Sequence, residues 1–194
     1  MAAQINDQQV VHRARVFEVV RENITLDNGA TVDFEFVQHP GAAAVVPVLN
    51  HSQIVLINQY RHALRETIWE IPAGTLDKRE SALVCAQREL IEETGYRAAA
   101  WETLAEITPV PGYSNERIHL FLARDLSPAR QDLDADEVLQ VHVVEFEKAM
   151  EMILRGEIRD GKTICGLLLA QPRLKQCAQQ SSRGPSGRSA SHDP

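Results

Sequence analysis

Apolar and polar residues alternate differently in successive parts of the chain. Residues 9–38 contain two β-rich runs of roughly alternating polarity, which are separated by Asp27-Asn28-Gly29. Because an Asn-Gly pair between such runs is a strong signal for a tight hairpin turn, we expect an antiparallel β unit here. His39-Pro40-Gly41 interrupts the pattern, so the sequence predicts an N-terminal β-rich extension over residues 1–41.

Strand and helix patterns are mixed in the residues that follow. Apolar runs predict strands over 42–50, 52–61, 117–126 and 139–146. Apolar residues at helical spacing predict helices over 81–94, 146–158 and about 160–170. Together these elements predict one α/β domain over residues 42–176. Residues 177–194 are rich in Ser, Gly and Pro and are predicted to form a disordered tail.

Composition and charge exclude some classes of function. With 44% hydrophobic residues among 194, the chain has enough apolar side chains for a substantial core. Its formal net charge of −7 argues against bulk nucleic-acid binding, which needs a basic surface. A small phosphorylated ligand is still allowed, because such a ligand needs only a few local cations or a metal ion.

The cysteines and the N-terminal residues indicate the cellular compartment of the protein. Cys85, Cys165 and Cys177 are widely spaced and include no C-x-x-C pair. This usage indicates a reducing compartment and excludes a disulfide framework or a zinc cluster. No signal-peptide pattern is visible, and no apolar run reaches the roughly 20 residues of a membrane helix. We therefore expect a cytoplasmic protein without a membrane partner.

Acidic residues cluster in the helix predicted from about Ser81. Glu89, Glu92 and Glu93 are related by i, i+3 and i+4, so their carboxylates share one face. Like charges at this spacing destabilise a helix unless something compensates for them. Arg88 can pair with Glu92, but the other two carboxylates are then left together. Apolar residues on both sides of the acidic stripe predict that the helix is packed on both flanks.

The acidic stripe suits a divalent cation. Hard cations prefer carboxylate oxygens, and Mg²⁺ usually keeps some waters and shares ligands with substrate phosphates. A stripe with incomplete charge compensation therefore indicates Mg²⁺, with Mn²⁺ as the other choice. The stripe alone also fits a solvated acidic helix face. Two glycines frame it: Gly74 at a bend next to the Ala73 carbonyl, and Gly95 where a left-handed helix cap is expected.

Nine residues between positions 74 and 96 resemble the Nudix box of the Nudix hydrolases. They are Gly74, Glu80, Arg88, Glu89, Leu90, Glu92, Glu93, Gly95 and Tyr96. The resemblance implies an α/β fold, a Nudix α/β/α sandwich around a mixed sheet, here with a small N-terminal antiparallel β extension. It also implies metal-dependent hydrolysis of a nucleoside diphosphate linked to another group.

The same resemblance implies roles for individual residues. Glu89 and Glu93 correspond to the principal metal ligands, and the Ala73 carbonyl corresponds to a further ligand. Glu92 lies close by and is expected to act as a metal ligand or a catalytic group. The other residues of the box are expected to support its structure: Gly74, Glu80, Arg88 and Gly95.

Further features resemble the ADP-ribose pyrophosphatases within this family. Pro111 lies sixteen residues after Gly95, inside the string 109–116. Gln59-Tyr60-Arg61 precedes Trp69-Glu70-Ile71-Pro72-Ala73-Gly74, and residues 156–163 resemble the closing helix of that group. The resemblance implies that four residues bind substrate: Arg61, Glu70, Pro111 and Glu116.

The resemblance also places a general base and a dimer interface. In ADP-ribose pyrophosphatases the base comes from an acidic loop before a late strand, and 132–137 is the matching loop here. Glu137 is the preferred base, with Asp136 and Glu116 as alternatives, although the loop also fits a solvated acidic turn. The N-terminal extension is expected to form a domain-swapped homodimer. Three aromatic residues in it are candidates for stacking on adenine: Phe17, Phe34 and Phe36.

The predicted reaction is the hydrolysis of ADP-ribose, or a related nucleoside diphosphate sugar, to AMP and ribose 5-phosphate. A GDP-mannose or ADP-glucose pyrophosphatase with the same machinery is an alternative. A Nudix-fold sensor that binds ADP-ribose without cleaving it is a third interpretation. The complete glutamate stripe argues against a sensor, and the flanking segments show no DNA-binding module.

Overall fold

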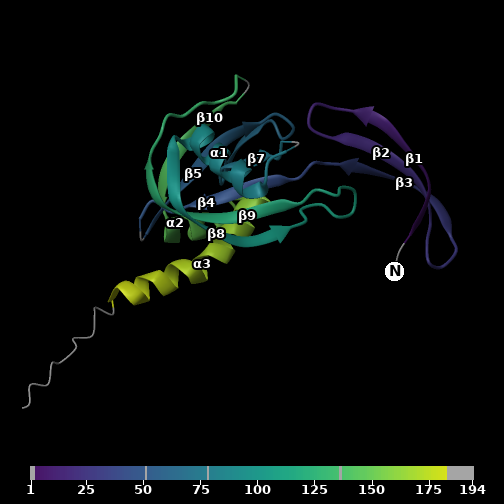
Figure 1. Cartoon of the computed structure of the whole chain (residues 1–194). Helices are drawn as coiled ribbons and strands as arrows, with labels where there is room; N and C mark the ends of the chain where they lie inside the picture. Colours follow the sequence, from purple (N-terminus) through teal and green to yellow (C-terminus); the bar gives the residue numbers. More distant parts are fainter. Residues whose placement is uncertain (1–2, 51, 78, 136, 183–194) are drawn as a thin grey trace, which may run out of the picture.

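The computed structural model describes residues 3–50, 52–77, 79–135 and 137–182 (Figure 1). The elements in chain order are β1 (Gln4–Arg13), β2 (Glu18–Thr25), β3 (Thr31–Gln38), β4 (Ala42–Pro47), β5 (Gln53–Arg61), β6 (Glu66–Glu70), β7 (Ala73–Thr75), α1 (Ala82–Thr94), β8 (Tyr96–Ile107), β9 (Ile118–Pro128), β10 (Leu139–Glu145), α2 (Phe146–Leu154) and α3 (Gly161–Ser182). They form three sheets, in the orders β1-β2-β3, β10-β5-β6 and β7-β4-β9-β8.

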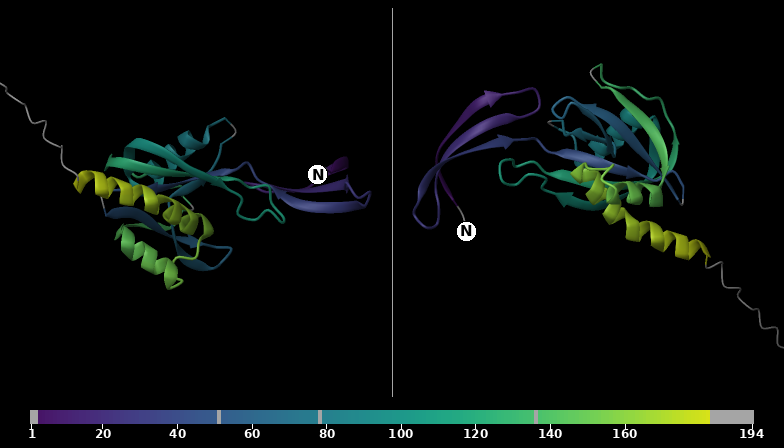
Figure 2. Two further views of the ribbon diagram at one scale, coloured as in Figure 1. Left: turned by 90° about the horizontal axis from the view of Figure 1, so that it is seen from below. Right: turned by 180° about the vertical axis from the view of Figure 1, so that it is seen from behind.

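The N-terminal strands form an antiparallel sheet that stands to one side of the other elements (Figures 1 and 2). Its β2–β3 hairpin turns at the predicted Asn-Gly pair, where Gly29 adopts φ 82°. Most residues avoid this left-handed backbone, whereas glycine adopts it without steric cost. The end of β3 is attached to the β8–β9 loop, because Val37 donates its N–H to the Tyr113 carbonyl and accepts the N–H of Asn115. The predicted hairpin is thus confirmed, although β1 begins at Gln4, before the expected start.

Strand β4 lies at the centre of the α/β/α arrangement that the sequence predicted. It pairs with β9 in parallel and with β7 antiparallel, so the sheet is mixed. Ala43 and Val45 pack with the buried side of α1, whereas Ala44 and Val46 pack with residues of α2, α3 and β5. Because both faces are covered, β4 is a continuous apolar run instead of an alternating one.

Helix α1 begins and ends where the sequence predicted. Ser81 caps it by accepting the N–H of Val84, and Gly95 ends it with φ 70° and an N–H donated to the Ile91 carbonyl. Cys85, Ala86, Glu89, Leu90 and Glu93 form its buried side. The expected packing on both flanks is wrong, because Val84 is 50% exposed. The helix therefore has one buried side, and this side carries two of the three glutamates of the stripe.

Some elements differ from the sequence expectation. The predictions omit β6, which is rich in polar residues, β7, which has three residues, and the alanine-rich β8, because none of these has a strong strand signal. Helix α3 passes through Pro172 and continues to Ser182, beyond its expected end near Ala170. A proline removes one helical hydrogen bond, but most of the residues that follow are good helix formers.

Helix α3 extends into the segment that was predicted to be a disordered tail. Residues 177–182, which were assigned to the tail, are helical, and residues 183–194 lie outside the described ranges. Although α3 has 22 residues, no helix in the described part of the chain is long and apolar enough to cross a membrane.

Candidate active site

An open cleft of about 550 Å³ lies beside the acidic side of α1. Its walls come from α1, β7, the end of β5, the loop before β10 and the turn between β1 and β2. Seven residues that the sequence singled out line it together: Arg61, Ala73, Gly74, Arg88, Glu89, Glu92 and Glu137. The fold thus brings together residues that are far apart in the chain.

Gly74 allows β7 to lie directly against α1. A Cβ built on Gly74 would fall 1.7 Å from Oε1 of Glu89, far inside van der Waals contact. Any other residue would displace either the strand or the carboxylate. A glycine at this position is therefore required for the observed placement of Glu89.

Arg88 connects the glutamates that surround it. Its guanidinium donates hydrogen bonds to Glu80 at 2.8 Å, to Glu89 at 2.7 Å and to Glu92 at 2.8 Å. The bond from Arg88 lowers the pKa of Glu80 to about 2, and Glu80 also accepts the N–H of Asp77. This geometry agrees with the supporting role expected for Arg88 and Glu80, because both hold the loop before α1 against the helix.

Glu89 and Glu93 are buried carboxylates on the same side of α1. Glu93 is 1% exposed, and its Oε2 accepts the backbone N–H of Ala73 at 2.9 Å. Burial raises the pKa of Glu89 to about 7 and raises the pKa of Glu93 well above its usual range. The repulsion between the two carboxylates adds to the shift for Glu93, and the charge of Glu137 adds to both shifts. A bound cation would relieve the repulsion that now favours protonation.

The donor set fits a divalent cation that is bound partly by the substrate. Among the described residues, no group of three or more His, Cys, Asp or Glu side chains is arranged so that it could hold a metal ion by itself. Mg²⁺ does not need such a group, because one or two carboxylates, waters and substrate phosphates usually complete its coordination. Glu89, with its carboxylate beside Gly74, and the neighbouring buried Glu93 would supply the carboxylates for such a cation.

Arg61 is held at the cleft wall by Glu70. The two residues lie on neighbouring antiparallel strands, and the guanidinium donates from Nε to Oε1 at 2.6 Å and from Nη2 to Oε2 at 2.8 Å. The side chain of Glu70 is 1% exposed, whereas that of Arg61 is 41% exposed. Glu70 was expected to bind substrate, but it is not among the residues that line the cleft. It lies behind Arg61 and orients it.

Pro111 and Glu116 are also absent from the cleft lining. Both lie in the β8–β9 loop, where Pro111 is exposed and Glu116 faces Nδ1 of His39 at 3.7 Å. Because the twelve residues of β8 separate this loop from Gly95, the loop lies at the other end of the strand, next to β3. The structure therefore gives no support to substrate contacts by these two residues within one chain.

The acidic loop before β10 is anchored to the end of α1. Gln131 donates from its side chain to the Glu93 carbonyl at 2.6 Å, and Asp132 donates its N–H to the Glu92 carbonyl. Glu137 lines the cleft, and its carboxylate accepts the N–H of Asp134 at 3.1 Å. The alternative base, Asp136, lies outside the described residues.

The sequence interpretation gave no role to four residues that line the cleft: Arg15, Val16, Thr75 and Asp77. Asp132 and Asp134 also line it, and both belong to the acidic loop 132–137 that the sequence singled out. Arg15 and Val16 come from the β1–β2 turn and also line a neighbouring hollow of about 580 Å³, which contains Phe17. Of the three candidate aromatics, Phe17 is therefore next to the cleft, whereas Phe34 and Phe36 contact each other on β3. Thr75 and Asp77 occupy unspecified positions of the box, so no motif indicated them.

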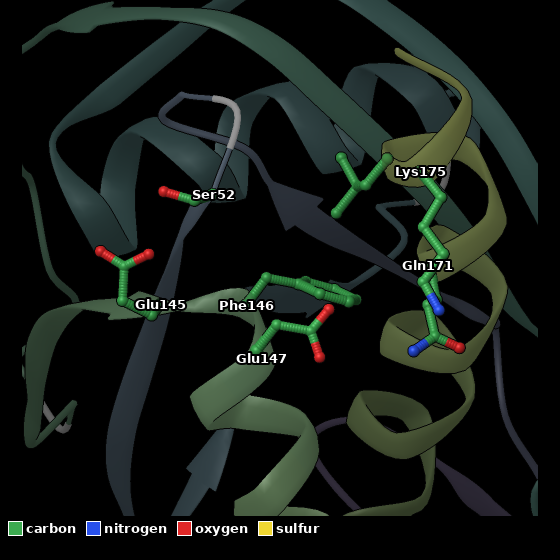
Figure 3. A pocket seen from close by; sticks show the side chains of 7 residues that line it. Ser52, Glu145, Phe146, Glu147, Gln171 and Lys175 are labelled. Carbon is green, nitrogen blue, oxygen red and sulfur yellow. The ribbon is translucent and has the colours of Figure 1, made fainter. Parts of the chain in front are cut away.

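A smaller hollow of about 180 Å³ lies between the start of α2 and α3. Figure 3 shows Phe146 between Glu145 on one side and Gln171 and Lys175 of α3 on the other, with the side chain of Glu147 next to the Phe146 ring. This hollow shares no lining residue with the cleft beside α1, and it contains none of the predicted site residues.

Comparisons with known proteins show the family to which the chain belongs. The model of the NUDIX domain matches residues 38–167. The chain is 38% identical to a methanol dehydrogenase activator of Bacillus methanolicus, over 83% of this chain and 88% of that protein. It is 36% identical to an ADP-ribose pyrophosphatase of Bacillus subtilis (strain 168), over 89% and 93%. A GDP-mannose pyrophosphatase of Cronobacter sakazakii is 37% identical, over 80% and 88%.

The fold has a close counterpart among solved structures. A crystal structure described as an ADP compounds hydrolase superposes with a TM-score of 0.81, at 23% identity, and covers 92% of this chain and 97% of that one. The family model covers more than half of the chain, and relatives above 30% identity cover most of it. The chain belongs to the Nudix hydrolase family.

Proposed function

We propose that the protein hydrolyses the diphosphate of ADP-ribose to AMP and ribose 5-phosphate, with Mg²⁺ or Mn²⁺ as cofactor. The observation that carries the proposal is the arrangement of Glu89 and Glu93, buried beside a cleft that Arg61 lines. Buried carboxylates supply the ligands for the cation, and a guanidinium at the cleft wall supplies a partner for the phosphates. The substrate follows the ADP-ribose pyrophosphatase to which the chain is 36% identical.

The protein's own residues bind the substrate and move a proton in this mechanism. Glu89, Glu93 and the Ala73 carbonyl would hold the cation, which would stabilise the charge that develops on the phosphoryl oxygens. Arg61 binds the diphosphate. Glu137 accepts a proton from the attacking water as the water oxygen bonds to phosphorus and the bond to the bridging oxygen breaks.

A second substrate is favoured by one comparison. The GDP-mannose pyrophosphatase relative has an identity similar to that of the ADP-ribose pyrophosphatase. Hydrolysis of ADP-ribose, ADP-glucose and GDP-mannose by the purified protein with Mg²⁺ discriminates between these substrates. A kcat/KM for ADP-ribose at least about tenfold above the others supports the proposal. Binding of ADP-ribose without product release would instead identify a sensor.

We also propose that two copies of the chain associate through the N-terminal sheet. Ile5, Val32 and Phe34 share one face of this sheet with Val20 and are 57%, 39% and 42% exposed. This face also carries the hydrogen-bonded pair of Gln8 with Glu22, whereas the opposite face is more polar and includes the pair of Arg21 with Glu35. An exposed apolar sheet face of this kind favours burial against another subunit.

Removal of residues 1–40 tests the dimer and its link to the site, because the β1–β2 turn lines the cleft. Light scattering should find a dimer for the full chain and a monomer for the truncated one. The truncated chain should also lose substrate binding. A truncated monomer with a normal KM would show that the segment is not part of the site.

The expected cytoplasmic location of the protein stays a prediction.

A further inference from the structure

Two positively charged side chains bind one buried carboxylate behind the cleft. Besides the two bonds from Arg61, Oε2 of Glu70 accepts a hydrogen bond from Nζ of Lys162, in the first turn of α3. The side chain of Lys162 is 12% exposed, and that of Glu70 is 1% exposed. Lys162 is not among the residues that line the cleft, and it is connected to Arg61 through the Glu70 carboxylate that both side chains bind.

The first turn of α3 holds Lys162 in place. Its Nζ lies 3.1 Å from Oδ2 of Asp160, which also accepts the N–H and the hydroxyl of Thr163. The hydroxyl oxygen of Thr163 accepts the N–H of Ile71 at 2.8 Å. The helix is thus bonded to two successive residues, Glu70 and Ile71, just before β7. The bonds among Glu70, Ile71, Asp160, Lys162 and Thr163 join the end of β6 to the start of α3 and form a support behind Arg61.

The orientation of Arg61 depends on this support. A guanidinium has five N–H groups, and Glu70 accepts two of those of Arg61, so three are left for a ligand. Their direction is fixed by the two bonds to Glu70. Burial opposes ionisation of Glu70, but the hydrogen bond from Arg61 and the charge of Lys162 outweigh it and lower the pKa of Glu70. When a buried carboxylate loses one of its two positively charged partners, its negative charge is only partly compensated.

We propose that Lys162 is a positioning residue for substrate binding, which fixes the Arg61 guanidinium through Glu70 in the orientation that receives the diphosphate. This inference rests on the proposed function, in which Arg61 binds the diphosphate. The effect is one of orientation and not of long-range attraction, because Asp160 compensates the charge of Lys162 at 3.1 Å.

The test is a double-mutant cycle on the full-length protein. KM and kcat for ADP-ribose with Mg²⁺ are measured for wild type, Lys162→Met, Arg61→Ala and the double variant. Lys162→Met keeps the length of the stem and removes the ammonium group. We expect it to raise KM about tenfold and to change kcat less than about threefold. In the Arg61→Ala background the same change should raise KM no further, because the two residues act in series.

Two further variants separate positioning from a general loss of structure. Lys162→Arg should restore KM to within about threefold of wild type, because it keeps the cation. Arg159→Met is the matched control: it breaks an ion pair with Glu66 of β6, but this pair is at the surface, with side chains 60% and 51% exposed. Its KM should not change, because exposed pairs contribute little. If Lys162→Met does not fold, Lys162→Gln takes its place in the cycle.

An unchanged KM for the Lys162 variant overturns the inference, as does an equal rise in the wild-type and Arg61→Ala backgrounds. Failure of the proposed function gives a different result, because wild type then releases no AMP from ADP-ribose. In that case calorimetry measures the dissociation constant of inorganic pyrophosphate for the same four proteins of the cycle. The same non-additive pattern supports the positioning role, and an additive pattern overturns it.

Discussion

The backbone N–H of Ala73 donates a hydrogen bond to Oε2 of Glu93, at 2.9 Å. This bond joins β7, which lines the cleft, to the last turns of α1, and it fixes one oxygen of the buried Glu93 carboxylate, which is not itself among the residues that line the cleft. Ala73 and Glu93 are twenty residues apart in the chain, and both belong to the set proposed to hold the cation. The strand and the helix therefore form one structural unit at the site.

The acidic pair should be essential for turnover and dispensable for folding. Glu93→Gln and Glu89→Gln, made separately, should each lower kcat by at least about 100-fold in the presence of Mg²⁺. The side-chain volume is kept, and a buried carboxyl group whose charged form is disfavoured is replaced by a neutral amide, so the melting temperature of the metal-free protein should hold or rise. Glu151→Gln, at an exposed position of α2, is the control. Near-normal hydrolysis by both site variants would contradict the assignment.

Stability of the metal-free protein should depend on pH through Glu89. Burial raises its pKa from the usual 4.5 to about 7. Between these values the folded protein keeps a proton that the unfolded chain has lost, so this residue's contribution to stability falls as pH rises from about 4.5 to about 7. Urea unfolding in EDTA should show this decline in wild type and a smaller one in Glu89→Gln. Equal slopes in the two proteins would count against a protonated Glu89.

The close approach of β7 to α1 should make Gly74 intolerant of substitution. Gly74→Ala places a methyl group where Glu89 now lies, so it should destabilise the protein by about 1–3 kcal/mol and abolish most turnover. Gly112→Ala is the matched control, because a Cβ there meets nothing within 4 Å. Denaturant unfolding and hydrolysis assays on both variants check the prediction. A Gly74→Ala protein as active as the Gly112→Ala protein would be incompatible with the observed packing.

Loss of the base and loss of the phosphate ligand should give different kinetic signatures. Glu137→Gln should lower kcat by about 10²–10⁴-fold with little change in KM, because proton transfer occurs only in the transition state. Arg61→Ala should mainly raise KM, because its contact with the phosphates already forms in the bound substrate. If Glu116→Gln or Asp136→Asn loses turnover while Glu137→Gln does not, the base is assigned to the wrong residue.

The sequence predicted those parts of the site that depend on local signals. Ser81 and Gly95 mark the ends of α1, and the spacing of Glu89 and Glu93 places both carboxylates on one side of it. The role of Glu70 could not be predicted in this way, because it depends on the pairing of β5 with β6. Arg15 was missed for the same reason: only the tertiary fold brings the β1–β2 turn to the cleft. The position of Pro111 in a motif likewise does not reveal that this residue lies outside the cleft.

The central claim is that this chain cleaves ADP-ribose with a divalent cation held by Glu89 and Glu93. The most direct measurement is chromatographic analysis of the products that purified full-length protein forms from ADP-ribose, with Mg²⁺ and with EDTA. The account predicts AMP and ribose 5-phosphate in equal amounts with Mg²⁺, and neither product with EDTA or from the Glu93→Gln variant. Intact ADP-ribose after incubation with Mg²⁺, or equal cleavage in EDTA, would contradict it.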